Sequence, residues 1–226
     1  MRIYVYNPDT NRMESFYRNL NDAMPYNIGR TLTVSEFRGV SRSTVLWTDK
    51  RYIETWNRFR SYYGRPIDVR YVFRRIWEGG HTGQSQHYAG GAFDTAHQLA
   101  EAERIRLHAS AVSFGGWSYV EPLRYTPTWV HFDKRLFPSA CPEGGYILVR
   151  RGSKGVYVMI LQDALNVLGF TGSGLDGVFG AGTENAVRRF QLAYGLSVDG
   201  IVGCNTWRRI TSAAVGIGMT ATVVNP

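Results

Sequence analysis

Cysteine is nearly absent from this chain of 226 residues, which carries only Cys141 and Cys204. Two cysteines are too few for the disulfide framework that stabilises small secreted domains, and their spacing excludes a CxxC zinc site. So small a number does not identify the redox compartment. It also leaves open whether Cys141 and Cys204 pair with each other.

Long apolar runs are missing as well. The longest lies in segment 213–224, where Gly and Thr interrupt it, and it is far too short to cross a bilayer. Residues 1–9 lack the apolar region of a secretory signal peptide. We therefore expect no membrane insertion and no secretory export of the chain as written, and the export route stays open.

Acidic residues are outnumbered, with 18 Asp and Glu against 26 Lys and Arg, which gives a formal net charge of +8. A basic surface suits a polyanionic partner such as nucleic acid, anionic lipid or an anionic cell wall. The Arg residues are dispersed and form no nucleic-acid-binding motif, so we expect no nucleic-acid partner. Hydrophobic residues make up 44% of the chain, which is enough for a packed core and excludes wholesale disorder.

An internal repeat marks the C-terminal third of the chain. Leu175–Gly180 is followed by Thr183, and Val198–Gly203 by Thr206, so that Asp, two Gly and Thr recur at an offset of 23 residues. Asp-Gly favours a turn, and we expect each Thr to cap the helix that follows. Apolar residues with helical spacing stand on both sides of the first turn. The pattern predicts three short helices joined by two similar loops.

These residues resemble the peptidoglycan-binding domain of bacterial and phage cell-wall hydrolases. The matching positions include Gly155, Leu161-Gln162, Leu168-Gly169, Asp176-Gly177, Phe190-Gln191, Asp199-Gly200 and Thr206-Trp207. The resemblance implies an all-α three-helix domain over residues 146–212, a C-terminal tail over 213–226, and peptidoglycan as the partner. Most matching residues are expected to be core or turn positions. Asp176, Phe179 and Trp207 are the candidates for contact with peptidoglycan.

Helix and strand patterns alternate in the longer N-terminal part. Aromatic residues at helical spacing between Asp49 and Gly64 predict a helix. Further patterns predict strands over 66–73 and 129–133 and a helix over 95–108. Helices with a small antiparallel sheet indicate an α+β domain, which we place at residues 1–140. Pro and Gly in segment 138–145 predict a linker to the helical domain.

Three residues from separate positions form a candidate metal site. Gly90-Gly91 stands between His87 and Asp94 and lets the chain fold back, so that both side chains face one point. His131 lies in an alternating segment, which puts His131 and Asp133 on one face of a strand. A catalytic zinc site needs three such ligands and one open position. Spacing alone does not establish the site, because a single histidine is more often a surface or core residue.

The pattern Ser85-x-His87-x2-Gly90-x-Ala92-x-Asp94, with Trp-Val-His-Phe-Asp at 129–133, resembles the zinc D-Ala-D-Ala peptidases and related wall endopeptidases of peptidase family M15. Upstream segments follow the same order: Val34–Phe37, Arg60, Tyr63–Ile67 and Phe73-Arg74. The resemblance covers residues 32–135. It implies a Zn²⁺ cofactor held by His87, Asp94 and His131, and metal-assisted hydrolysis of a peptide bond.

The resemblance also implies roles for residues around the metal. Arg74 would orient a substrate carboxylate or help to polarise the scissile carbonyl. Ser85 would support its loop or donate a hydrogen bond to substrate. His81, in the Gly-rich loop, is a further candidate for contact with substrate or metal.

The general base is the point at which this chain departs from the family. Many members carry an acid three residues before the last His ligand, or a second His two residues before it. Thr128 and Trp129 occupy these positions here, and neither accepts a proton. Asp133 and Glu121 remain as candidates. Asp133 is equally suited to orienting a ligand histidine, and Glu121 to being a solvated loop acid, so the assignment stays open.

Both resemblances imply a two-domain cell-wall hydrolase, in which a zinc peptidase for the peptidoglycan stem or cross-link is tethered to its substrate by a binding module. A zinc N-acetylmuramoyl-L-alanine amidase and a non-catalytic peptidoglycan-binding protein on an inactive peptidase fold are the alternatives. The bond that is cut, and the choice between carboxypeptidase and endopeptidase, stay open. We expect a monomer that acts at the bacterial cell wall, as a phage lysin, a sporulation enzyme or a protein released by lysis.

Overall fold

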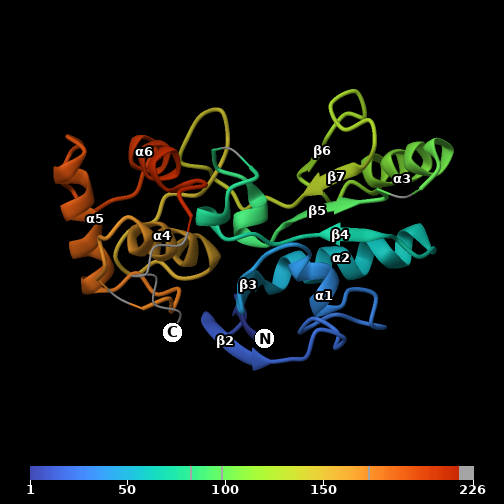
Figure 1. The fold of residues 1–226 in the computed structure, drawn as a ribbon, viewed down its shortest axis with the longest axis horizontal. Coiled ribbons are helices and arrows are strands. Elements are labelled where there is room, and N and C mark those ends of the chain that lie inside the picture. Colours follow the sequence, from blue (N-terminus) through green and yellow to red (C-terminus); the bar gives the residue numbers. More distant parts are fainter. Residues whose placement is uncertain (82, 98, 173, 219–226) are drawn as a thin grey trace.

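The computed structural model describes residues 1–218 except Thr82, Gln98 and Ser173. Its elements are β1 (Arg2–Asn7), β2 (Arg12–Tyr17), α1 (Val34–Arg38), β3 (Val45–Asp49), α2 (Lys50–Tyr63), β4 (Val69–Tyr71), the 3-10 turns η1 (Ile76–Glu78) and η2 (Gln86–Ala89), β5 (Ala92–Thr95), α3 (Glu101–Phe114), β6 (Tyr119–Val120), β7 (Val130–Asp133), α4 (Val156–Val167), α5 (Ala181–Ala193) and α6 (Cys204–Ala214). The three helices α4, α5 and α6 lie at one end of the molecule, and α3 with β6 and β7 lies at the other (Figure 1). The mixed N-terminal part and the helical C-terminal part agree with the expected classes.

The first sheet has the order β2-β1-β3. β1 and β2 form an antiparallel hairpin, whereas β1 and β3 are parallel, with Tyr4 opposite Trp47. β3 is buried along its whole length and runs directly into α2. This sheet therefore fixes the position at which α2 begins.

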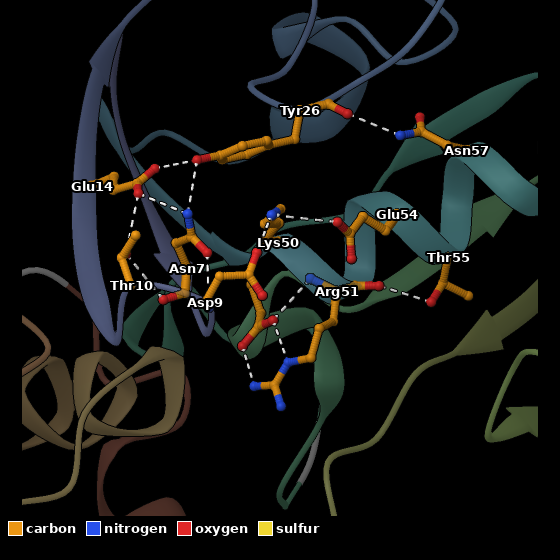
Figure 2. A network of polar contacts seen from close by, with 11 residues as sticks. Asn7, Asp9, Thr10, Glu14, Tyr26, Lys50, Arg51, Glu54, Thr55 and Asn57 are labelled. Atoms are coloured by element: carbon orange, nitrogen blue, oxygen red, sulfur yellow. Dashed lines mark hydrogen bonds and ion pairs between the residues drawn. The ribbon is translucent and has the colours of Figure 1, made fainter.

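A network of polar side chains attaches the β1–β2 hairpin to α2 (Figure 2). The Tyr26 hydroxyl donates a hydrogen bond to Glu14 on β2, and Lys50 at the start of α2 forms an ion pair with Asp9. Asn57 Nδ2 on α2 donates to the Tyr26 carbonyl oxygen at 2.9 Å. Because the ion pair is near the surface, we expect it to orient the hairpin more than to stabilise the fold.

The helix predicted between Asp49 and Gly64 is confirmed as α2. The Asp49 side chain accepts a hydrogen bond from Arg51 N at 2.9 Å, and Gly64 ends the helix in the left-handed conformation with φ +67°. The apolar face of α2 is buried, and Trp56 stacks on Phe93 of β5 with 4.9 Å between ring centroids. This face thereby supports the second sheet.

The second sheet, β4-β5-β7-β6, is antiparallel. In its register Asp94 on β5 lies opposite His131 on β7, and Ala92 lies opposite Asp133. Directly opposed residues of antiparallel strands bring their side chains close together. The predicted strand over 129–133 is confirmed, and it now has a partner strand that carries Asp94.

Two predicted elements have different bounds in the structure. The strand expected over 66–73 is reduced to β4. The helix expected over 95–108 is wrong at its N-terminal end, because Thr95 belongs to β5 and α3 begins only at Glu101. Pairing with β7 holds Thr95 in the extended conformation, and Ala96 follows with φ +60°, which interrupts any helix at that point.

The three helices α4, α5 and α6 confirm the repeat, and a buried glutamine holds each of its loops. Gln162 Nε2 donates to Asp176 Oδ1 at 2.7 Å, and Gln191 Nε2 donates to Asp199 Oδ1 at 2.8 Å. The same amides also donate to carbonyl oxygens of the loops, those of Val178 and Ile201. The echo in the sequence is therefore a repeated hydrogen-bonding unit.

The expectation that Thr183 and Thr206 cap their helices is wrong. Gly180 and Gly203 occupy the cap positions, and the two threonines lie inside the first turn, where they are buried. Their hydroxyls accept hydrogen bonds from the Gln162 and Gln191 amides at 3.2 and 3.3 Å. The two threonines therefore complete the glutamine networks and do not begin the helices.

The helical domain shares one continuous hydrophobic core with the N-terminal part. Every residue of α4 is buried, because the helix is enclosed by its own domain and by β3, η1 and η2. Arg75, just before η1, and Asp163 on α4 are both 0% exposed, and Arg75 Nε donates to Asp163 Oδ2 at 2.8 Å. Segment 138–145 therefore joins two parts that are packed together and does not separate them.

Cys141 and Cys204 form a disulfide, which answers the question of their pairing. The bond attaches segment 138–145 to the first residue of α6. The tail expected over 213–226 begins inside α6, and beyond it Gly216 N and Gly218 N donate to the carbonyl oxygens of Ile76 and Trp77 at 3.1 and 3.0 Å. Residues 219–226 lie outside the described residues.

Within the described part of the chain, none of the helices combines the length and the apolar character needed to cross a membrane.

Replacing both Cys141 and Cys204 by Ser is expected to lower the free energy of unfolding by about 2–4 kcal/mol. The bond joins residues 63 positions apart, so its loss frees a long loop in the unfolded chain. Urea unfolding of the double variant, compared with oxidised and reduced wild type, measures the effect. Equal midpoints for the variant and the oxidised wild type would contradict the prediction.

Asp163→Ala is expected to lower the free energy of unfolding by about 3–5 kcal/mol, because it leaves the Arg75 charge buried without its carboxylate. Asp9→Ala serves as a matched control, since it breaks the Lys50–Asp9 pair near the surface and should leave the midpoint nearly unchanged. Thermal and urea unfolding of the two variants supply the comparison. An equal loss of stability in both variants would show that the buried pair stabilises the fold no more than the pair near the surface does.

Candidate functional site

A cavity of about 750 Å³ lies between the second sheet and the helical domain. Most of the residues singled out from the sequence line it: His81, Ser85, His87, Asp94, Glu121, His131 and Asp133. The structure therefore brings together side chains from the Gly-rich loop, β5 and β7. The opposite wall is formed by residues 143–145 and by α6, which spacing in the sequence did not indicate.

Local backbone structure sets the position of His87. Ser85 caps η2, and its hydroxyl accepts a hydrogen bond from His87 N at 3.3 Å. Gly90 ends η2 in the left-handed conformation with φ +67°, and an added Cβ there would lie 2.4 Å from the Trp47 carbonyl oxygen. The chain therefore turns back at Gly90 as expected, and β5 then delivers Asp94 to the same cavity.

Asp94 is the centre of the cluster. Its Oδ1 lies 2.7 Å from His131 Nδ1 and 3.5 Å from His87 Nε2. His87 Nδ1 lies 3.0 Å from the Val72 carbonyl oxygen, which can only accept a hydrogen bond, so Nδ1 carries the proton. His87 Nε2 is the ring nitrogen that faces Asp94, and it is buried with no hydrogen-bond partner among the described residues. This is the orientation that a metal-ligating histidine adopts.

Without a metal ion, the charges in the cluster keep Asp94 and His131 in their ionised forms. Burial alone would raise the pKa of Asp94, but the proximity of His87 and the hydrogen bond from His131 outweigh it and keep the pKa well below its usual value. Burial alone would lower the pKa of His131, whereas hydrogen bonds with Asp133 and Asp94 raise it to about 9. The site thus stabilises a positive charge beside Asp94.

His81 joins the cluster from the Gly-rich loop. Its ring stacks on His87 with 4.2 Å between centroids, and its Nε2 lies 3.1 Å from the Tyr71 hydroxyl. One donor atom each from His81, His87 and Asp94 lies within 4.8 Å of the others. Burial, with the proximity of His87, lowers the pKa of His81 to about 3, so the ring is neutral at physiological pH and is able to act as a ligand.

The two candidates for the base have different surroundings. Asp133 is buried and receives two hydrogen bonds from Arg135, from Nε at 2.8 Å and from a terminal nitrogen at 3.0 Å, while His131 Nε2 lies 3.6 Å away. Glu121 is anchored by its backbone, with N donating to the His131 carbonyl oxygen at 3.0 Å. Among the described residues, nothing forms a hydrogen bond or ion pair with the Glu121 carboxylate, which lines the cavity.

Among the described residues that line the cavity, Arg74 is absent. Its guanidinium packs over the Tyr71 ring at 5.3 Å, and an added Cβ at Gly80 would approach it to 3.3 Å. The contact of Arg74 with substrate stays a prediction, and its side chain packs against Tyr71 and the Gly-rich loop. Sequence spacing did not indicate Tyr119, Trp129 and Arg135, which do line it.

Two of the candidates for peptidoglycan contact are buried. Phe179 is 1% exposed and Trp207 is 0% exposed, so both side chains belong to the core of the helical domain. Trp207 Nε1 donates to the Ile147 carbonyl oxygen at 2.8 Å. Asp176 is exposed, but its Oδ1 accepts the hydrogen bond from Gln162 and another from Val178 N at 2.8 Å. These three positions therefore build the domain, and the expectation that Phe179 and Trp207 contact the polymer is corrected.

Residues 154–210 match the protein family described as "Putative peptidoglycan binding domain". This match covers α4, α5 and most of α6. The presence of a peptidoglycan-binding domain in this part of the chain agrees with the first resemblance. The cavity residues on η2, β5 and β7 precede the matched segment.

Curated relatives are cell-wall lytic proteins. A spore cortex-lytic enzyme of Bacillus cereus is 42% identical over 66 residues, 29% of this chain and 26% of that protein. A probable N-acetylmuramoyl-L-alanine amidase of Bacillus licheniformis is 42% identical over 77 residues, 31% of this chain and 22% of that protein. A zinc D-Ala-D-Ala carboxypeptidase of Streptomyces albus G is 48% identical over 63 residues, 26% of this chain and 24% of that protein. The chain thus spans about a quarter of the length of the relatives it matches.

The metal-free protein is expected to become less stable as pH rises from 6.5 to 9. The pKa of His131 is about 9 in the folded protein against an ordinary value of 6.5, so its stabilising contribution is complete below pH 6.5 and is lost as pH passes 9. Urea unfolding in the presence of a chelator, repeated across this range, measures it. His131→Gln should flatten the profile, and parallel profiles for variant and wild type would contradict the assignment.

Proposed function

We propose that this protein is a zinc-dependent peptidase that hydrolyses peptide bonds of the peptidoglycan stem or cross-link. The observation that carries the proposal is the convergence of His87, Asp94 and His131 in one cavity. A buried ring nitrogen without a partner, such as His87 Nε2, costs free energy unless a ligand satisfies it. The fixed tautomer of His87 makes this nitrogen ready to bind a cation.

The donor atoms of the cluster fit zinc. Two imidazole nitrogens and one carboxylate oxygen are ligands that zinc prefers, and three protein ligands leave one position for substrate or water. When bound, zinc supplies Lewis-acid activation of water and of the scissile carbonyl. His87, Asp94 and His131 would hold the ion, and His131 would be neutral in that state because a ligating imidazole carries no proton on its ligating nitrogen.

The remaining catalytic and positioning roles belong to residues around the cluster. We assign proton acceptance from the attacking water to Glu121, which lines the cavity and whose carboxylate has no hydrogen-bond or ion-pair partner among the described residues. Asp133 is held by Arg135 and orients His131, which matches the second of the two roles considered for it. Ser85 supports η2, and His81 is positioned to contact substrate or the metal.

The peptidoglycan-binding domain supports the choice of substrate. Attachment to an insoluble polymer raises the concentration of peptide stems at the cavity without any new contact there. The excess of basic residues favours adsorption to anionic walls, and this contribution weakens with salt. The Cys141–Cys204 disulfide suits action outside a reducing cytoplasm, and we place the protein at the cell wall as a monomer.

An amidase is the second candidate, and the amidase among the relatives favours it. An amidase would cut between the glycan and L-Ala and leave new amino groups on L-Ala, whereas a peptidase would leave them within the stem or cross-link. A protein that only binds the wall is the third candidate, favoured by Thr128 at the position of the usual acid. Analysis of the products from purified sacculi separates these three activities.

His87→Ala is expected to reduce bound zinc from about one ion per chain to a small fraction and to lower hydrolysis of sacculi by about 100-fold or more. Elemental analysis and product release measure the two effects on the same preparations. His108→Ala, which removes a histidine of α3 that does not line the cavity, is the matched control and should retain both. Zinc absent from wild type, with sacculi bound but uncut, would leave a wall-binding protein and refute the peptidase.

A further inference from the structure

The peptidoglycan-binding domain supplies part of the cavity wall. Arg208, Thr211 and Ser212 of α6 line the same cavity as His87 and Asp94. A module that served only as an anchor would have no reason to face the metal cluster. The placement of α6 therefore calls for a role in holding the part of the substrate that lies beside the scissile bond.

Three independent attachments fix α6 at this position. The disulfide joins its first residue, Cys204, to the loop at Cys141. Tyr146, which packs edge-to-face on Trp207, donates from its hydroxyl to the Ser85 carbonyl oxygen at 2.8 Å. After α6, Gly216 N and Gly218 N donate to the carbonyl oxygens of Ile76 and Trp77, which attaches the C-terminal end of the helix. The wall formed by α6 is thus as firmly placed as the sheet that carries the ligands, which is what a specific subsite needs.

Arg208 is the cation on this wall. Its Nε donates to Glu143 Oε1 at 3.0 Å, and the two side chains are 57% and 53% exposed. An ion pair with this exposure has little net stability, so an incoming carboxylate can replace Glu143 at small cost. Arg135, the other arginine that lines the cavity, has both of its short hydrogen bonds on the buried Asp133. Arg208 is therefore the guanidinium that is free to exchange its partner for substrate.

We propose that Arg208, with Ser212 beside it on α6, forms a subsite for a free carboxylate of the peptide stem. Stem peptides carry a C-terminal carboxylate and a side-branch carboxylate on D-Glu, and guanidinium groups bind carboxylates with charge-assisted hydrogen bonds. Glu143 occupies the subsite in the absence of substrate. The inference rests on the proposed function for the identity of the substrate, but the binding step it describes does not require hydrolysis.

The test compares Arg208→Glu with Arg209→Glu, which makes the same charge change at the next position of α6. Arg209 is exposed, packs over the Tyr194 ring at 4.6 Å and does not line the cavity, so it controls for charge and for helix stability. The ligands are a synthetic stem pentapeptide with both carboxylates free and two analogues in which one carboxylate or the other is amidated. Titration calorimetry of the full chain, with a chelator present to stop turnover, gives each dissociation constant. Hydrolysis of the same peptides by zinc-loaded protein gives KM and kcat.

Wild type and Arg209→Glu are expected to bind the free peptide about tenfold more tightly than one of the two amidated analogues. Arg208→Glu should bind all three peptides equally weakly, with KM raised and kcat little changed. Glu143→Gln should have the opposite effect and lower KM, because it removes the internal competitor. A purely structural role for the ion pair would not give opposite signs for its two partners.

The outcomes separate the subsite from the proposed activity. Active wild type with indistinguishable Arg208→Glu and Arg209→Glu variants would overturn the subsite and leave the peptidase standing. Peptide binding that depends on Arg208, with neither the pentapeptide nor purified sacculi hydrolysed by zinc-loaded wild type, would support the subsite and overturn the peptidase. Wild type that does not bind the pentapeptide and hydrolyses neither it nor purified sacculi would overturn both.

Discussion

The buried pair of Arg75 and Asp163 is the interaction on which the arrangement of this molecule depends. A guanidinium with no exposed surface is tolerated only when its charge and its hydrogen bonds are satisfied, and Asp163 on α4 supplies the charge. Arg75 also donates to Ser43 Oγ at 3.1 Å and packs over the Trp47 ring at 4.9 Å, so it joins α4 to the N-terminal sheet. Because α4 is fixed in this way, α6 comes to face β5 and β7. The cavity exists only in the gap between these two parts.

Within that cavity, the charges and the backbone geometry both favour a positive charge beside Asp94. The β5–β7 register sets Asp94 beside His131, and the turn at Gly90 brings His87 to the other side of the same carboxylate. A buried carboxylate flanked by two imidazoles needs a positive charge in its vicinity, and a proton on His131 provides one in the absence of metal. In the proposed function, a divalent cation would meet the same requirement. The short contact between His131 and Asp94 therefore marks a position at which the fold favours positive charge.

Residues with local signals were predicted well from the sequence. The turn residues of the repeat, the capped helix α2 and the alternating strand β7 depend on neighbours along the chain, and each was placed correctly. Seven of the cavity residues were also identified, because local spacing and the family resemblance together pointed to them. Local signals did not predict three other features: the parallel pairing of β1 with β3, the strand β5, and the contribution of α6 to the cavity wall. Each depends on contact between segments distant in sequence, and Thr95 shows how such pairing overrides a local helical pattern.

The shared wall affects how the helical domain would contribute to the proposed activity. A module on a flexible linker acts through effective concentration alone, and its benefit falls as the linker lengthens. Here the continuous core and the disulfide leave no such freedom, so in the proposed function a polymer strand held by the helical domain would lie at a fixed distance and angle from His87 and Asp94. Fixed geometry restricts which strands are reached, but it gives each bound stem an orientation as well as proximity. Because orientation contributes more to the rate of a chemical step than concentration does, rigid attachment favours selection among stems over reach along the wall.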